Sequence, residues 1–378
     1  MKNDTSSIRA SHVNDGTSTE RLRWSDKDKR GPVLRHPTLQ LSSERSDTTP
    51  YGGLALAAGL VRRLEIARDL DQELSLLSSH RPFHESDHVL THVYNLFAGG
   101  TCIEDIADLQ TSEPVRRMLG AARIPDPTTA GDFLRRFDTA SLKSLDRVID
   151  QAQEKVWKRR YGKTKAARAI VDLDSHVRPV YGDQKEGTDF TYKGSFGYHP
   201  LVISMAGTLE CLRLVNRSGN APSAEGSEDH LRELFPMLGR RFKQVIVRGD
   251  SAFAKQAIFD ACDEAGHGFA VVSGQQKNFT SLFEALPGEV WKPYREHDER
   301  KQRRGKRRKR GINRRQERAR SRGKRDLQLK EQWIAEIAYQ PERSQRPYRL
   351  IARYQEIDEH EQGELFLLSR FRYVLSNL

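Results

Sequence analysis

The chain has few of the features that mark secreted, disulfide-bonded or membrane-spanning proteins. Its three cysteines, Cys102, Cys211 and Cys262, lie far apart in 378 residues and form no C-x-x-C pair. This usage indicates neither a disulfide framework nor a cysteine zinc site. The longest apolar run, GGLALAAGLV at 52–61, is far shorter than a membrane span, and the first residues carry no apolar signal segment. We therefore expect a soluble, cytoplasmic protein with no membrane partner.

The chain also has too few acidic residues to balance its basic ones. It contains 64 Lys and Arg against 52 Asp and Glu, a net charge of +12, which favours a polyanionic partner such as nucleic acid. Residues 300–325 alone hold sixteen Lys or Arg and one acid, a net +15, so the remainder of the chain carries −3. The segment contains no aromatic residue, so we expect phosphate binding without base stacking. The alternative is a solvated loop with no dedicated role. The candidate DNA-binding residues are Lys306, Arg307, Arg308, Lys309, Arg310, Arg314 and Arg315.

Composition and periodicity divide the chain into three regions. Residues 1–50 mix Ser, Thr, Asp and Arg with little apolar periodicity, which is typical of a disordered arm. Residues 51–162 carry apolar residues at steps of three and four, interrupted by Gly and Pro, and predict an all-α domain of about six short helices. From about residue 163 the period changes to two and the composition becomes β-prone.

One segment of the helical region, TTAGDFLRRF at 128–137, could complete a helix-turn-helix. Thr128 or Thr129 is the expected N-cap, and Arg135 and Arg136 would then face DNA. Short helix pairs are common and the motif has no strict signature, so a plain helical bundle with a solvated basic face is the alternative.

The second half of the chain alternates strand and helix patterns in a recognisable order. RAIVDLDSHVRPVYG, YHPLVISMAG and LECLRLVNRSG predict three strands, and helix, strand, helix and strand patterns follow through GFAVVSG. Three antiparallel strands followed by alternating helices and strands are expected of a ribonuclease-H-like fold, a mixed α/β sheet flanked by helices.

Two of the predicted strands end in an aspartate followed by a serine. IVDLDS ends at Asp174 and Ser175, and VIVRGDS ends at Asp250 and Ser251. In the predicted sheet these strands are neighbours, so the two carboxylates face each other at the edge where α/β sheets bind ligands. Carboxylates this close repel unless a cation lies between them.

A divalent cation is the simplest way to resolve this repulsion. Mg²⁺, or Mn²⁺ in its place, prefers oxygen ligands, and two ions together assist phosphoryl transfer. Asp174 and Asp250 are therefore candidate metal ligands and catalytic residues. Asp172 points to the same face and is a candidate for a supporting carboxylate that does not itself bind the metal; direct ligation is the alternative. The alternative for Asp250 or Ser251 is to cap the following helix.

These motifs carry a family resemblance. DLDSHVRPVYGDQKEG, TYKGSFGYHPLVISMAG and VIVRGDSAFAKQAIFDACDEAG resemble the DDE transposases of bacterial insertion sequences, specifically the group-1 DDE transposase domain. The helical stretch from YGGLALAAGLVRRLEIARDLD to PTTAGDFLRRF is similar to the N-terminal part of that family.

The resemblance implies both a fold and an activity. It implies a ribonuclease-H-like catalytic core over residues 163–378 with a basic insertion at about 295–326, preceded by a DNA-end-binding helical domain. It also implies two divalent metal ions and cut-and-paste DNA transposition at terminal inverted repeats, with Asp174 as the first acid and Asp250 as the second. Double-stranded DNA, both transposon ends and target, is the implied partner. A dimer on paired ends and a nucleoid-associated location are further expectations of the resemblance.

One part of the family pattern is missing. The third acid of these transposases lies in a Y-x-x-R-x-x-x-E motif, and no such motif follows Asp250. We therefore expect a C-terminally truncated copy whose cleavage activity is impaired. Glu331 and Glu336 lie in a stretch with a helical pattern before the last predicted strands, and neither fits the motif. The alternatives are a DNA-binding protein that competes for transposon ends without cleaving them, and a ribonuclease-H-like nuclease.

A second motif has a weaker interpretation. HESDH at 84–88 matches the H-E-x-x-H pattern of zinc proteases, which needs both histidines on one helical turn. Ser86 is a good N-cap, which would leave His84 outside the helix. We therefore expect no zinc site here, and we expect His88 and His92 to be partly buried.

Overall fold

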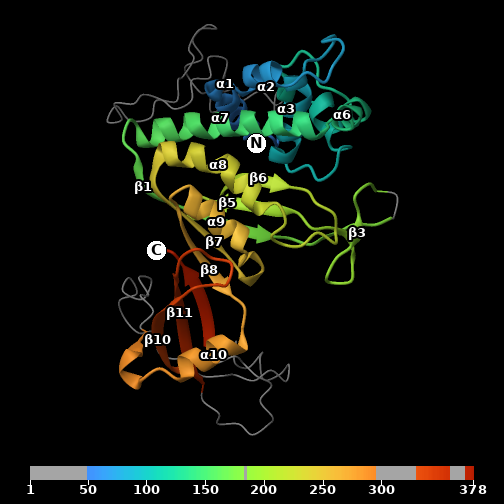
Figure 1. The fold of residues 1–378 in the computed structure, drawn as a ribbon. Coiled ribbons are helices and arrows are strands. Elements are labelled where there is room, and N and C mark those ends of the chain that lie inside the picture. Colours follow the sequence, from blue (N-terminus) through green and yellow to red (C-terminus); the bar gives the residue numbers. More distant parts are fainter. Residues whose placement is uncertain (1–48, 183–184, 295–328, 358–370) are drawn as a thin grey trace, which may run out of the picture. The chain divides into compact units, whose positions relative to one another are not determined.

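The computed structural model describes residues 49–182, 185–294, 329–357 and 371–378, and these divide into two compact units at residues 160 and 161 (Figure 1). The predicted arm at 1–50 lies almost entirely outside the described residues. The basic insertion, with all seven of its candidate DNA-binding residues from Lys306 to Arg315, also lies outside them.

The N-terminal unit is helical, as the periodicity predicts. Six short helices precede one of 23 residues, and none within the described ranges is long and apolar enough to cross a membrane. Their apolar stripes form a shared core that includes Leu54, Ala58, Ile106 and Leu109. The helices are α1 (Leu54–Leu64), α2 (Ile66–Glu73), α3 (Glu85–Phe97), α4 (Ile106–Thr111), α5 (Glu113–Leu119), α6 (Pro127–Leu134) and α7 (Thr139–Tyr161).

Two predicted helix starts are wrong by a few residues. Asp126, not Thr128 or Thr129, is the N-cap of α6, and its Oδ1 accepts a hydrogen bond of 3.0 Å from the Thr129 amide. The reason is Pro127. Proline is pre-organised for the first helical position, so the residue directly before it, Asp126, becomes the N-cap.

In α3 the N-cap is His84, so Ser86 lies inside the helix. Ser86 instead donates hydrogen bonds to Asp71 from both its amide and its hydroxyl, each 2.9 Å long. The Ser86 hydroxyl, which favoured this residue as a cap, is therefore bonded to the Asp71 carboxylate instead.

The second unit is built on a mixed sheet flanked by helices. The strand order is β6-β5-β1-β7-β8-β12-β11-β10-β9, and β1 runs antiparallel to β5 and parallel to β7. The five strands from β6 to β8 follow the predicted sequence of elements, and the fold is ribonuclease-H-like. The strands are β1 (Ala166–Ser175), β5 (Leu201–Met205), β6 (Glu210–Val215), β7 (Phe242–Gly249), β8 (Gly268–Ser273), β9 (Lys292–Pro293), β10 (Leu329–Tyr339), β11 (Tyr348–Ile357) and β12 (Phe371–Ser376).

Helices and a small second sheet complete this unit (Figure 1). Helix α8 packs on α9 and against β1 and β7, and α9 packs against β8. The small sheet has the order β2-β4-β3 and lies in the connection between β1 and β5. The remaining elements are α8 (Ser227–Arg241), α9 (Gln256–Glu264), α10 (Lys277–Glu284), the 3-10 turns η2 (Ser251–Phe253) and η3 (Gly288–Val290), and the strands β2 (Arg178–Pro179), β3 (Asp189–Phe190) and β4 (Phe196–Tyr198).

Alternation along β1 sorts its side chains between two faces. Ala169, Val171 and Leu173 are buried, whereas Asp172 and Asp174 lie on the opposite face and are more exposed. The aspartates therefore do not enter the core that the strand helps to build.

The stretch around Glu331 and Glu336, which has a helical pattern, is strand β10. It pairs with β11 from Leu329 opposite Ile357 to Tyr339 opposite Tyr348. The stretch is rich in helix formers such as Glu, Ala and Gln, and the helix prediction followed that composition. Pairing with a long neighbouring strand overrides this local preference, as tertiary context commonly does.

Candidate active site at the ends of β1 and β7

The two aspartates predicted as metal ligands lie at adjacent positions, where the pairing between β1 and β7 stops. The parallel pairing of β1 with β7 runs up to Leu173 opposite Gly249; Asp174 is the next residue of β1, and Asp250 directly follows β7. Neighbouring strands are about 4.8 Å apart, so the two backbones are close where the carboxylates begin. This is the carboxyl edge of two parallel strands, where sheets of this class bind ligands.

Each of these carboxylates makes one local hydrogen bond and remains exposed. Asp174 Oδ1 accepts from the Ser175 amide at 2.7 Å, and Asp250 Oδ1 accepts from the Ala252 amide at 2.9 Å. Asp250 thus caps the short turn η2, while α9 begins later, after Lys255. Within the described part of the chain, neither carboxylate takes part in an ion pair. Oxygen atoms of both side chains are therefore available to a cation.

Asp172 has a different environment, because Arg248 binds both of its oxygens. The two residues lie opposite each other in the register of β1 and β7. Arg248 Nε donates to Asp172 Oδ1 at 2.7 Å, and Nη2 donates to Oδ2 at 2.8 Å. The bidentate bond to Asp172 raises the pKa of Arg248. Asp172 is thus ion-paired with Arg248, and both lie two residues before the exposed aspartate at the end of their strand.

A buried histidine, which sequence reasoning missed, fixes the residue after Asp174. His199 is 2% exposed, its Nε2 lies 3.0 Å from Ser175 Oγ, and its Nδ1 lies 2.8 Å from the Ala221 carbonyl oxygen. A carbonyl oxygen only accepts, so Nδ1 donates; in a neutral ring Nε2 then accepts from the serine hydroxyl. The available signal was a histidine near the start of the predicted strand YHPLVISMAG.

Arg217 holds the backbone around this histidine. Its guanidinium donates to the carbonyl oxygens of His199 at 3.1 Å and Glu225 at 2.7 Å, and also to those of Pro222 and Ser223. Burial of Arg217 lowers its pKa. The loop behind the end of β1 is therefore tied together by hydrogen bonds to one arginine.

The acids of β10 are remote from this edge. Strand β10 is separated from β1 by β7, β8, β12 and β11, which makes five strand spacings or about 24 Å. Glu336 is in addition paired with Arg349 of β11. Neither Glu331 nor Glu336 can join Asp174 and Asp250 in one site with this sheet order.

Arg135 and Arg136 lie at the end of α6. Arg135 is exposed and its Nη1 is 2.6 Å from Asp132 Oδ1. Arg136 is also exposed, and its Nη1 donates to the Leu76 carbonyl oxygen at 3.4 Å. Both side chains have intramolecular partners, and a contact of either with DNA stays a prediction.

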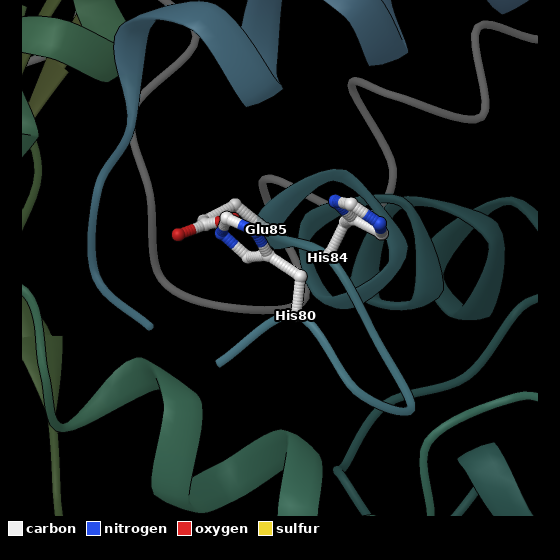
Figure 2. A group of neighbouring side chains, drawn as sticks. All are labelled: His80, His84 and Glu85. Atoms are coloured by element: carbon white, nitrogen blue, oxygen red, sulfur yellow. The ribbon is translucent and has the colours of Figure 1, made fainter. Parts of the chain in front are cut away.

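A second group of side chains with metal-ligand chemistry lies in the N-terminal unit (Figure 2). Candidate ligand atoms of His80, His84 and Glu85 all lie within 4.8 Å of one another, a condition that Asp172, Asp174 and Asp250 do not meet together. His80 Nε2 is 3.2 Å from Glu85 Oε2, and the rings of His80 and His84 stack at 4.7 Å.

Local structure accounts for this group. Glu85 is buried, and its Oε1 accepts from the amides of Leu76 and Leu77 at 3.0 and 3.1 Å. Burial raises the Glu85 pKa, but these hydrogen bonds outweigh it and leave the pKa below its usual value. Glu85 therefore stays charged, fixes the backbone that leads to α3, and gains a partner in His80.

The second histidine of the H-E-x-x-H pattern belongs to the core. His88 is buried, and its ring stacks on Phe133 at 4.4 Å, so it is more deeply buried than predicted. Burial lowers its pKa and favours the neutral ring. His92 is partly buried, with Nε2 3.2 Å from the Ala130 carbonyl oxygen.

Comparison with known protein families assigns the chain. Residues 32–378 match the model of a family described as transposase DDE domain group 1. The chain belongs to this family of transposase DDE domains. The family generally uses divalent metal ions.

Further comparisons add little to the assignment of this transposase domain. A chain in the cryo-EM structure of the piggyBac transposase synaptic complex with hairpin DNA aligns with 12% identity and a TM-score of 0.36. The alignment covers 89% of the present chain and 63% of that chain, less than two thirds of its length. The comparison with curated proteins gives no match.

Proposed function

We propose that this chain is a DNA transposase of an insertion sequence, which cleaves and rejoins phosphodiesters at terminal inverted repeats in cut-and-paste transposition. One observation carries the proposal. Asp174 and Asp250 follow directly on paired positions of two neighbouring parallel strands, and both are exposed. In a chain of the DDE family, this is the arrangement expected of the first and second acids.

The donor set of this edge suits a hard divalent cation. Two carboxylates lie at adjacent strand ends, and Arg248, an arginine on the same face, is hydrogen-bonded to Asp172. Without a cation the two carboxylates repel each other. Asp174 and Asp250 would hold Mg²⁺ or Mn²⁺, two ions by the family pattern, with water completing the coordination. When bound, the ions neutralise charge on the phosphate and activate water or a 3′ hydroxyl.

The neighbouring residues give this edge a fixed geometry. Ser175, bonded to His199, holds the backbone directly after Asp174, and the turn η2 holds Asp250. Such support keeps metal ligands in place when substrate binds, because their own side chains need not reorganise. Asp172, the third carboxylate of this face, is bonded to Arg248 and therefore does not compete for the cation.

DNA is the proposed substrate and partner. The helical unit would bind transposon ends, with Arg135 and Arg136 as candidate contacts, and the basic segment that includes Lys306 to Arg315 would add salt-sensitive phosphate binding. A dimer on paired ends and binding of both transposon and target duplexes complete the proposal.

A second candidate function is DNA-end binding without cleavage. The observation that favours it is the shortage of a third carboxylate at this edge among the described residues. Asp172 is ion-paired with Arg248, and the acids of β10 lie about 24 Å away. A protein with only two available acids could occupy inverted repeats and exclude an active transposase.

A plasmid assay separates these functions. Purified full-length protein is incubated with Mg²⁺ or Mn²⁺ and a supercoiled plasmid that carries both ends of the element. End-specific nicks with strand transfer indicate a transposase, unspecific cuts indicate a ribonuclease-H-like nuclease, and binding alone indicates the second candidate.

The matched variants test the site itself. Loss of a residue that hydrogen-bonds to a metal ligand lowers metal affinity or activity by about 10- to 100-fold. Loss of a ligand itself should cost at least as much, so Asp174→Asn and Asp250→Asn should each lower cleavage by about 100-fold or more. Asp229→Asn, an equivalent change at an exposed position of α8, is the control and should cleave like the parent. Parent-like cleavage by both Asp174→Asn and Asp250→Asn would show that the assignment is wrong.

A further inference from the structure

The small sheet between β1 and β5 ends in a tight turn that presents aromatic side chains to solvent. Phe190 is 67% exposed and Tyr192 is 73% exposed. Between β3 and β4 the Thr191 amide and hydroxyl both donate to the Ser195 carbonyl oxygen at 2.9 Å, and Gly194, at a φ of 74°, closes the turn. Thr191 itself is buried. The aromatic rings are thus displayed on a well-fixed backbone.

A basic side chain lies beside one of these rings, and two more are exposed in the same segment. Lys193 Nζ lies 5.6 Å from the centre of the Tyr192 ring, a cation–π arrangement, and Arg178 and Lys185 are exposed on the same sheet segment. Of the two acids in the described part of this segment, Asp189 is engaged by Asn220 Nδ2 at 2.5 Å and by the Phe190 amide. The surface therefore combines exposed aromatic faces with a lysine placed beside one of them.

A chain of contacts connects this turn to the candidate active site. The Tyr192 ring lies 5.5 Å from the His199 ring, and His199 Nε2 lies 3.0 Å from Ser175 Oγ. Ser175 directly follows Asp174 and donates its amide to the Asp174 carboxylate. A nucleotide on Tyr192 would therefore lie close to a phosphate at the carboxylate edge.

We propose that Phe190, Tyr192 and Lys193, here called the aromatic tip, bind an unpaired nucleotide of the DNA end, with its base on Tyr192 and its phosphate at Lys193. Aromatic side chains beside cations stack on the faces of single-stranded bases with little sequence preference. Paired bases inside a duplex do not offer those faces, so the tip selects unpaired nucleotides. The inference rests on the proposed function for its substrate, DNA.

The test compares two DNA probes on the full-length protein. One is a short blunt duplex with a fluorescent label, and the other is the same duplex extended by a few unpaired thymidines. Anisotropy is measured without divalent metal, so that no cleavage occurs, and at raised salt, where unspecific phosphate binding weakens. The quantity of interest is the ratio of the two dissociation constants, in which binding by the basic segment cancels.

The parent should bind the extended duplex more tightly than the blunt one. Tyr192→Ala should reduce that preference by about 5- to 100-fold, and Tyr192→Trp should retain it because the ring is preserved. Lys193→Ala should lower the slope of log affinity against log salt by about one for the extended probe. Tyr181→Ala, a change at a tyrosine that is 96% exposed in the same segment, is the control and should keep the parent preference.

Several results would overturn the inference. One is equal binding of both probes by the parent, and another is an unchanged preference in Tyr192→Ala. A third is a change in the sedimentation of Tyr192→Ala with an unchanged probe ratio, which would show that the aromatic tip contacts protein and not DNA. Circular dichroism of Tyr192→Ala and Tyr192→Trp confirms that both variants fold. Failure of the proposed function is distinguishable from failure of this inference. In that case the plasmid assay with metal shows no cleavage, whereas the preference for the extended probe is intact.

Discussion

Asp263 of α9 connects the helix to the C-terminal strands, and we predict that Asp263→Asn destabilises this unit. Its carboxylate accepts hydrogen bonds from Arg346 Nε at 2.8 Å, from the Tyr348 hydroxyl at 2.8 Å and from Asn377 Nδ2 at 2.6 Å. The Asp263 side chain is 16% exposed, and Tyr348 is buried. The substitution keeps the shape of the side chain but removes its charge and one acceptor.

The magnitude follows from these partners. A hydrogen bond to a charged group contributes about 1.5–3 kcal/mol, and the bonds from Tyr348 and Asn377 are little exposed. Arg346 is more than half exposed, so solvent screens its ion pair and it adds little. Asparagine still accepts one bond. We therefore expect the free energy of unfolding to fall by about 2–3 kcal/mol.

The effect should depend on pH in a defined direction. Burial raises the Asp263 pKa, but the hydrogen bonds from Arg346, Tyr348 and Asn377 outweigh it and hold the pKa below its ordinary value. A lowered folded-state pKa gives stability that is present above the unfolded pKa, about 3.9, and is lost as the pH falls through the folded value. The difference between parent and variant should be constant near neutral pH and shrink below about pH 4.

Urea unfolding followed by circular dichroism at a series of pH values measures this difference. The midpoint should fall with an unchanged slope, since the unfolded surface is the same. Asp229→Asn, at a largely exposed ion pair of α8, is the matched control and should change stability by less than about 0.5 kcal/mol. Equal midpoints for Asp263→Asn and the parent at pH 7, or a difference that persists undiminished at pH 3, would refute the reasoning.

Two further predictions concern other parts of the second unit and the thiols. In Gly219→Ala the added Cβ would overlap the carbonyl oxygens of Asp189 and Gly197, so the small sheet must shift. We expect a loss of about 1–3 kcal/mol in urea unfolding, and a parent-like midpoint would contradict it. Burial raises the pKa of Cys262 to about 12, whereas the other two cysteines are exposed. A disulfide thiol reagent at pH 8 should therefore modify two thiols in the folded protein and three in urea, and rapid modification of all three without urea would contradict it.

The placement of Asp174 and Asp250 at one edge could be predicted because its signals are local. An apolar strand that ends in Asp-Ser occurs twice, and strand order brings Asp174 and Asp250 to one edge. The pairing of Asp172 with Arg248 was available by the same logic, because each lies two residues before the strand-end aspartate. Once the parallel register is known, the two must face each other.

Other features depend on contacts between residues far apart in the chain. The bond between His199 and Ser175 joins residues 24 positions apart, and no local pattern indicates it. Residues 329–339 form strand β10 because they pair with β11. This pairing outweighs the helical preference of the residues themselves. The start of α6 at Pro127 differs from the prediction for a local reason: two threonines are good caps, but an aspartate directly before a proline takes precedence.

Iron-directed cleavage of the protein backbone tests the central claim most directly. Fe²⁺ replaces the divalent ion, and ascorbate with peroxide then generates hydroxyl radicals that cut the chain next to the bound metal. The account predicts cuts near Asp174 and near Asp250, both suppressed by excess Mg²⁺ and both lost in either Asp174→Asn or Asp250→Asn. Cuts that persist in both variants, or that fall only near His80 and Glu85, would contradict it.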